Sequence, residues 1–148
     1  MDFCQAYGVK GRFLGTRLDG DIGEMLANLD SVLSGPGNGL YDVPHGRAIA
    51  TLLPPVMDYN RQAAPEKFAA LEKVFRKELP DSNAQQNVAE MVSALARENG
   101  IPSKLSELGI ANEQLDEILD DAMPRQDMQN NARNIDRNAA EQMLRTML

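Results

Sequence analysis

The sequence predicts an all-α fold, a bundle of six or seven helices. In segment after segment, apolar residues recur at the spacing that places them on one face of an α-helix. No segment alternates apolar and polar residues over the length of a half-buried strand. Aromatic residues, which strands favour, make up only 5% of the chain, and tryptophan is absent. The 148 residues are enough for one domain with its own core.

Two regions are expected in the chain. Residues 1–18 are interrupted by three glycines whose spacing does not match a phosphate-binding loop, so we expect an irregular N-terminal arm. Residues 19–148 are expected to form the helical domain. Its first helix is predicted over residues 19–33, where an apolar stripe of helical spacing ends before a Gly-Pro stop.

Prolines mark the next two helices. Residues 46–60 form the second predicted helix, and Pro54 and Pro55 should kink or split it because neither has an amide donor. Pro65 suits the first turn of the third helix, and Pro80 should end it.

The fourth helix is expected between an N-cap at Ser82 and Gly100 at its C-terminus. A short helical turn over residues 102–105 should follow, ended by Gly109. Asn112 is predicted to cap the next helix, and Asp136 the last one, with a polar loop at 124–135 between them. The predicted inward-facing residues of the helices after Pro65 are Phe68, Leu71, Val74, Phe75, Val88, Met91, Val92, Leu95, Leu115, Ile118, Leu119, Met123, Ala140, Met143, Leu144 and Met147.

Composition excludes several classes of function. The formal net charge of -7 argues against nucleic acid and anionic membranes as partners, since both need a positive patch. Cys4 is the single cysteine, so no internal disulfide can form and a reducing compartment is expected. The sequence has no apolar run of about 20 residues and no secretory pattern at its N-terminus, so the expected location is the cytoplasm.

The single histidine, His45, lies between Pro44 and Gly46 at the expected start of a helix. Proline fixes the approach of the backbone and glycine lets another group come close, so His45 is well placed to act as a ligand. The motif Tyr-x-x-Pro-His-Gly that contains it, followed by Leu-Leu-Pro-x-Val-Met-x-Tyr-Asn up to Asn60, resembles the iron-containing (group III) alcohol dehydrogenase family. Further matches stand in the family's order at Ala64-Pro65-Glu66-Lys67, Gly100-Ile101-Pro102-Ser103-Lys104-Leu105, Leu108-Gly109-Ile110 and Asn130-Asn131-Ala132-Arg133, where the family usually has Asn-x-Pro-Arg.

The resemblance covers residues 40–148 and implies one half of a two-domain enzyme. Family members bind NAD(P) in an N-terminal α/β domain and hold a divalent iron or zinc ion in a C-terminal helical domain, through one Asp and three His. This chain is similar to the helical domain alone, because no strand followed by a glycine fingerprint precedes it in the sequence.

The resemblance carries few of the metal ligands across. His45 corresponds to the Pro-His-Gly histidine, and two further family histidines fall on Ser31 and Gly35. Asp2 takes the place of the family's Asp, with Ala6 where a histidine belongs. Asp2 and His45 are too few for a tight iron or zinc site, which takes four to six ligands, and the spacing gives no support to replacement by Cys4, Asp42 or Asp58.

We therefore predict a remnant of the family's helical domain that is not catalytic alone, holds no cofactor, and acts as an interaction or structural protein. Two alternatives remain open. The chain could be one subunit of a split NAD(P)-dependent alcohol dehydrogenase with a separate nucleotide-binding subunit. It could also be a small metal-binding protein that uses His45, although a histidine at a helix entrance more often bonds to backbone.

A homodimer is also predicted. In the family the helical domain packs against the cofactor domain, and without that neighbour a wall around His45 would face water. Pairing of this wall about a twofold axis would cover it, unless the arm at residues 1–18 folds back over it with Phe3, Phe13 and Leu14. The expected members of the wall are Leu40, Tyr41, Val43, Ile49 and Leu52.

Overall fold

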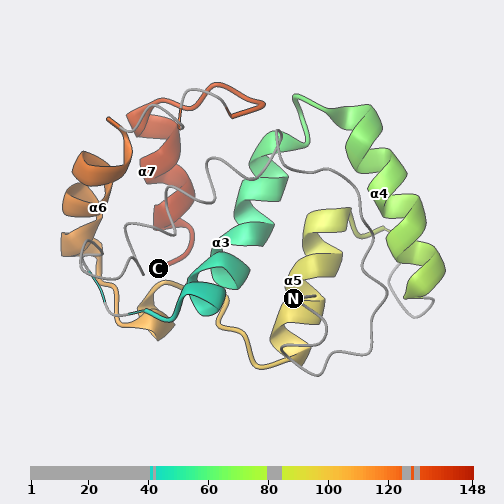
Figure 1. Cartoon of the computed structure of the whole chain (residues 1–148), viewed down its shortest axis with the longest axis horizontal. Coiled ribbons are helices and arrows are strands. Elements are labelled where there is room, and N and C mark those ends of the chain that lie inside the picture. The colour runs from blue at the N-terminus through green and yellow to red at the C-terminus, as the bar shows by residue number, and fades with distance from the viewer. Residues whose placement is uncertain (1–40, 42, 80–84, 125–127, 129–130) are drawn as a thin grey trace.

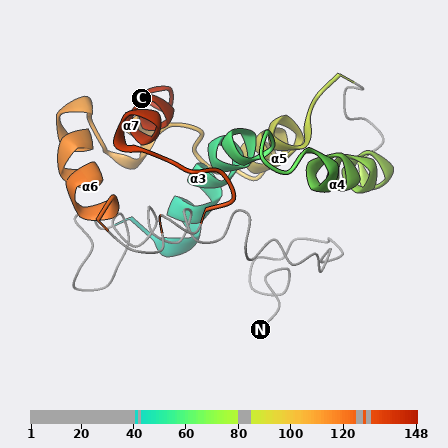
Figure 2. The same ribbon diagram turned by 90° about the horizontal axis from the view of Figure 1, so that it is seen from above.

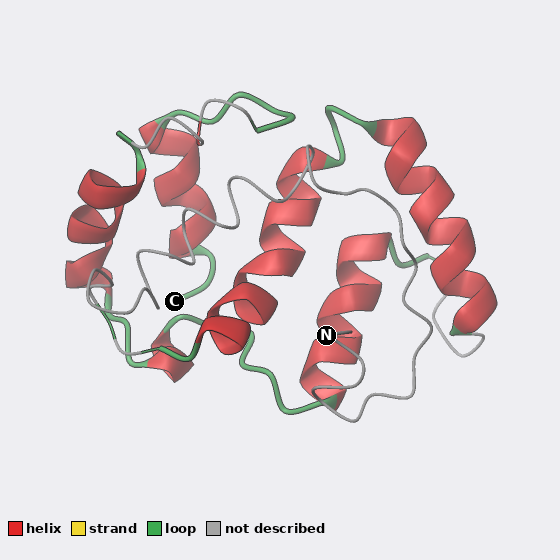
Figure 3. Cartoon of the chain, viewed as in Figure 1, coloured by secondary structure: helices red, strands yellow, loops and turns green. Residues whose placement is uncertain are grey.

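The structure, a computed structural model, describes residues 41, 43–79, 85–124, 128 and 131–148. Within these ranges every regular element is helical and no strand occurs (Figure 3), which confirms the all-α fold class. The arm at 1–18 and the helix at 19–33 lie outside the described residues. The elements are α3 (His45–Asn60), α4 (Pro65–Glu78), α5 (Val88–Glu98), α6 (Leu115–Ala122), α7 (Arg137–Arg145) and the short 3-10 helices η1 (Ser106–Leu108) and η2 (Asn112–Gln114).

Helix α3 is the central element of the described fold. Helix α5 packs along one side of it, and α4 packs against α5 further out (Figure 1). Helices α6 and α7 pack against each other on the opposite side of α3, as the view from above also shows (Figure 2). The motif that resembles the dehydrogenase family therefore forms the centre of this domain.

Pro54 and Pro55 lie inside α3, which continues unbroken through both of them, so the predicted split is wrong. Each internal proline removes a helical hydrogen bond and costs about 3 kcal/mol. Leu52, Val56 and Met57 lie on the same helix and are 0%, 0% and 3% exposed. Burial of a large apolar side chain contributes about 1.5–3 kcal/mol, so packing of this face offsets the loss.

The N-cap of α5 is Asn87 and not Ser82, which lies outside the described residues. The side-chain oxygen of Asn87 accepts a hydrogen bond from the Glu90 amide at 3.1 Å. In return, the Glu90 carboxylate accepts one from the Asn87 amide at 2.7 Å. The two bonds form a capping box, which satisfies two amides at the start of the helix.

Other helix ends follow the prediction. Pro65 opens α4. Gly100 and Gly109 have φ angles of 73° and 82°, and these positive values allow the chain to leave α5 and η1. Asp136 caps α7, since its carboxylate accepts a hydrogen bond from the Ala139 amide at 2.8 Å. The short turn lies at Ser106–Leu108, later than the predicted 102–105.

The predicted cap at Asn112 is wrong. Asn112 is the first residue of η2, and α6 begins three residues later at Leu115. The side-chain oxygen of Asn112 accepts a hydrogen bond from the Arg145 guanidinium, which joins this turn to α7. The amide of Ala111 donates instead to the side chain of Gln114 at 2.7 Å.

The core is formed mainly by the predicted stripes. In α6 and α7, Leu115, Ile118, Leu119, Ala140 and Leu144 are all almost fully buried. The outer residues of several stripes, Val74, Phe75, Val92, Leu95 and Met123, are only half-buried. No helix in the described ranges has the length and apolar character needed to cross a bilayer.

The predicted water-facing wall does not form as expected. Val43 and Leu52 are core residues, at 7% and 0% exposure. Tyr41 and Ile49 are partly buried against the same core, and Leu40 lies outside the described residues. The four described side chains pack within the domain, so the expected dimer cannot rest on Val43 and Leu52.

Candidate functional site

His45 is the first residue of α3, where the sequence predicted a helix entrance. The preceding residue, Pro44, accepts hydrogen bonds at its carbonyl from the amides of Arg47 at 2.8 Å and Ala48 at 3.0 Å. These bonds close the first turn of the helix. The backbone position of the predicted ligand is therefore fixed by local structure, while Asp2, Cys4 and Asp42 lie outside the described residues.

Asp58 is not placed to complete a metal site with His45. Both residues belong to α3, thirteen positions apart. At a rise of about 1.5 Å per residue, their backbones lie about 20 Å apart along the helix axis. The Asp58 carboxylate instead pairs with the Arg61 guanidinium at 2.6 Å. In the described part of the chain, no group of three or more His, Cys, Asp or Glu side chains could hold a metal ion.

Two segments that carry the family resemblance meet at the C-terminal end of α3. Asn60, the last residue of the helix, donates from its amide nitrogen to the side-chain oxygen of Asn131 at 2.9 Å. Asn131 donates back to the side-chain oxygen of Asn60 at 2.7 Å. Both residues are buried, at 0% and 8% exposure. A reciprocal pair satisfies polar groups that would otherwise be costly to bury.

The neighbouring residues strengthen this junction. Arg133 donates to the Tyr59 carbonyl at 3.2 Å, and its guanidinium lies 4.2 Å from the centre of the Tyr59 ring. The Tyr59 hydroxyl donates to the Asn134 carbonyl at 2.7 Å. A cation at the negative end of a helix is favourable, and α3 has no basic residue in its own last turn. The motif residues at this end therefore hold the C-terminal end of α3 against the segment that precedes α7.

Tyr41 fixes the other end of the motif. Its hydroxyl donates to the Glu117 carboxylate at 3.0 Å, which joins the chain before α3 to α6. Burial raises the pKa of Tyr41 above its usual value, and the hydrogen bond to the anionic Glu117 raises this pKa further. Tyr41 is therefore a neutral hydrogen-bond donor at neutral pH.

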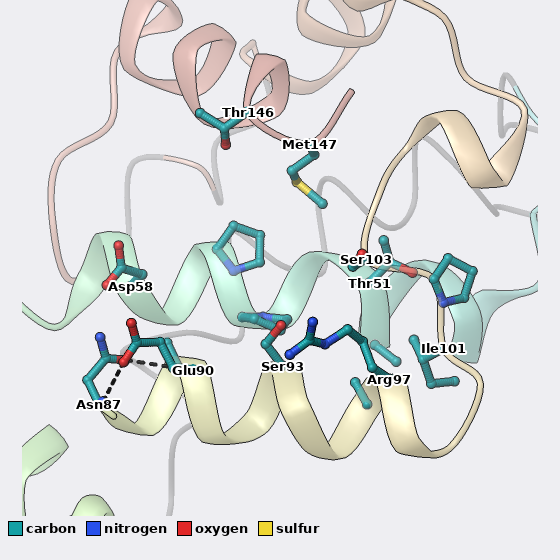
Figure 4. A pocket seen from close by; sticks show the side chains of 16 residues that line it. Thr51, Asp58, Asn87, Glu90, Ser93, Arg97, Ile101, Ser103, Thr146 and Met147 are labelled. Atoms are coloured by element: carbon teal, nitrogen blue, oxygen red, sulfur yellow. Dashed lines mark hydrogen bonds between the residues drawn. The ribbon is translucent and has the colours of Figure 1, made fainter. Parts of the chain in front are cut away.

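A cleft of about 300 Å³ lies between α3, α5 and the C-terminal residues. Thr51 lies in its wall and is 2% exposed, and its hydroxyl has no hydrogen-bond partner among the described residues. Ala50 lies beside it, and the carbonyls of these two residues lose their usual helical donors because residues 54 and 55 are prolines. Figure 4 shows Asp58, Asn87 and Glu90 at one end of the cleft, Thr51, Ile101 and Ser103 at the other, and Ser93 and Arg97 between them.

The family is decided by the extent of the sequence match. The model of the C-terminal part of the Fe-containing alcohol dehydrogenase family matches residues 32–148. The chain belongs to this family. Tyr41, His45, Asn60 and Asn131 all fall within the matched range, so the resemblance of their motifs is confirmed.

Curated relatives agree with this assignment. The chain is 43% identical over 76 residues to the 1,3-propanediol dehydrogenase of Citrobacter freundii, a match that covers 49% of this chain and 19% of the relative. It is 33% identical over 91 residues to the lactaldehyde reductase of Escherichia coli (strain K12), covering 60% and 24% of the two chains. With the maleylacetate reductase of Pseudomonas knackmussii it shares 31% over 107 residues, covering 72% and 28%. The matches thus span only 19–28% of the length of these relatives.

A solved structure gives the same result for the fold. The crystal structure of a 1,3-propanediol oxidoreductase superposes with a TM-score of 0.63 at 28% sequence identity. The superposition covers 84% of this chain and 31% of the oxidoreductase. The predicted likeness to the family's helical C-terminal domain is therefore confirmed.

Proposed function

We propose that these 148 residues form a non-catalytic relative of the family's helical domain, which acts as an interaction or structural protein. The observation that carries the proposal is the junction of Tyr59 and Asn60 with Asn131 and Arg133. Motif residues of a dehydrogenase family here join the C-terminal end of α3 to the segment that precedes α7. A single histidine in the whole sequence supports the same conclusion, since the family's site takes three.

The residues present do not fit a family metal centre. The candidate ligand Asp2 lies outside the described residues. Asp58, considered as a substitute ligand, lies on the same helix as His45 but thirteen positions away. A catalytic step through a metal ion is therefore not part of the proposed function. Oxidation of an alcohol by transfer of hydride would in addition require a bound nicotinamide cofactor, for which the sequence offers no glycine fingerprint.

The purified chain is expected to show no nicotinamide-dependent turnover of short alcohols or aldehydes, and no stoichiometric metal. Activity is measured with both nicotinamide cofactors, and metal by elemental analysis after dialysis against iron or zinc. The variant His45→Ala serves as the control in both experiments. One iron or zinc per chain that is lost in His45→Ala would support the metal-binding alternative instead. Turnover that appears only when a nucleotide-binding chain is added would support the split dehydrogenase.

An interaction protein needs an interface, and we expect self-association as a homodimer. Sedimentation equilibrium at high micromolar concentration should give twice the chain mass of 16.3 kDa. The surface involved must differ from the predicted wall, because Val43 and Leu52 are already buried within the chain. A mass of one chain at all concentrations would refute the dimer.

A further inference from the structure

Two arginines border a second hollow of about 340 Å³, next to the cleft between α3 and α5. Arg47 reaches it from the first turn of α3, and Arg97 from the last turn of α5. Arg97 and Ser103 line both the hollow and the cleft, so the two spaces adjoin each other. Figure 4 shows the Arg97 side chain extending from α5 into the space between the two helices.

These two arginines differ from the others of the described chain. Arg61 and Arg137 pair with carboxylates, Arg133 bonds to α3, and Arg76 donates to a backbone carbonyl. Arg145 likewise pairs with Glu141. Among the described arginines, Arg47 and Arg97 alone have side chains that make no hydrogen bond or ion pair with a described residue. In a chain of net charge -7, two guanidinium groups without a described partner on one hollow are suited to bind an anion.

The acid that borders the hollow does not neutralise these arginines. Glu107 directs one carboxylate oxygen to the amides of Ser103, at 3.2 Å, and Lys104, at 3.1 Å. No ion pair joins Glu107 to Arg47 or Arg97 in the described chain. No described acid therefore pairs with the two arginines at the positive end of the combined space.

The adjoining cleft suits uncharged polar groups. Ser93 lies one helical turn before Arg97 on α5 and, within the described chain, its hydroxyl has no hydrogen-bond partner. The carbonyls of Ala50 and Thr51 receive no helical hydrogen bond from residues 54 and 55, because proline has no N–H group. They are therefore acceptors for the hydroxyl group of a ligand. The carboxylates of Asp58 and Glu90 at the far end disfavour a ligand that carries a second negative charge.

We propose that the hollow and the cleft together bind a small hydroxycarboxylate. Its carboxylate would lie between the guanidinium groups of Arg47 and Arg97, and its hydroxyl beside Ser93. A guanidinium group can donate two parallel hydrogen bonds to a carboxylate. The volume of the cleft is at the lower end of the range for small-molecule sites. This binding does not depend on whether the chain is catalytic.

The test is a nuclear magnetic resonance titration of the full chain labelled with nitrogen-15. The probes are 3-hydroxybutyrate and butyrate, two monoanions that differ by one hydroxyl, together with inorganic phosphate. We expect saturable shifts of the amides near Arg97 and Ser103 at about 10 mM or less, with 3-hydroxybutyrate about fivefold tighter than butyrate. The absence of saturable shifts, or tighter binding of phosphate than of 3-hydroxybutyrate, would overturn the proposal.

Three variants and one control locate the site. Arg47→Gln and Arg97→Gln should each weaken 3-hydroxybutyrate binding about tenfold, since each removes a charge-assisted hydrogen bond. Ser93→Ala should bring the affinity for 3-hydroxybutyrate down to that for butyrate. Lys73→Gln removes one positive charge from an exposed position of α4 and should change the affinity less than about twofold. Equal losses in Lys73→Gln and Arg97→Gln would mean unspecific attraction and contradict the site.

Discussion

Replacing Leu52 by Ala is expected to lower the free energy of unfolding by about 2–5 kcal/mol. Leu52 is 0% exposed and lies on the central helix, two residues before the first of its prolines. The helix lacks two of its own hydrogen bonds there, so its stability depends on packing. The loss is measured by urea denaturation followed by circular dichroism, and the m-value should stay unchanged.

Leu53→Ala is the matched control for this prediction. Leu53 occupies the same helix and has the same side chain, but it is only half-buried. Its replacement should cost about 1 kcal/mol, the usual size for a partly exposed position. Equal losses for Leu52→Ala and Leu53→Ala would contradict the conclusion that the buried face holds α3 together across Pro54 and Pro55.

Replacing Asn131 by Ala should lower the free energy of unfolding by about 1–3 kcal/mol, because it removes both hydrogen bonds that the buried side chain of Asn60 shares with Asn131. The nearby Asn134→Ala is the control. Asn134 is exposed and receives the Tyr59 hydroxyl through its backbone carbonyl, which the substitution keeps. Its effect should stay within about 0.5 kcal/mol.

A double-mutant cycle isolates the pair. If the two amides act on each other, Asn60→Ala combined with Asn131→Ala should cost less than the sum of the single changes, by about 0.5–3 kcal/mol. Strict additivity would show that Asn131 acts mainly through its other hydrogen bond, to the Arg133 carbonyl at 2.6 Å.

Features of the fold set by local signals could be predicted from the sequence. Pro65 begins α4, Asp136 caps α7, and Gly100 and Gly109 end their helices as expected. Each of these outcomes depends on the φ angle or the hydrogen bond of one residue and its close neighbours. The apolar stripes likewise identified the helices, since periodicity reflects which face is buried.

Features that depend on distant contacts could not be predicted this way. Asn112 resembles a cap, but its side chain is engaged by Arg145 from another helix. The prolines of α3 resemble a break, but core packing keeps the helix continuous. The capping box at Asn87 and Glu90 is a local signal, with Asn three residues before Glu, that the sequence analysis missed.

The candidate site shows the same division. The sequence identified the segments around His45, Asn60 and Asn131 as belonging together by family resemblance. It did not indicate that Asn60 and Asn131 bond to each other, because the pair joins residues 71 positions apart. The sequence also did not indicate that the guanidinium groups of Arg47 and Arg97 have no partner among the described residues, because a sequence gives the charged residues but not the ion pairs that they form.

The separation of Asn60 and Asn131 also bears on how the chain folds. Closing a loop of 71 residues costs about 4 kcal/mol of chain entropy, more than one pair of amides contributes. The pair can therefore form only after helix packing has already brought the two ends together. Asn131→Ala should accordingly speed unfolding and leave the folding rate almost unchanged, which gives a φ-value near zero in stopped-flow measurements. We therefore expect the two hydrogen bonds between Asn60 and Asn131 to be among the last contacts that form as the domain folds.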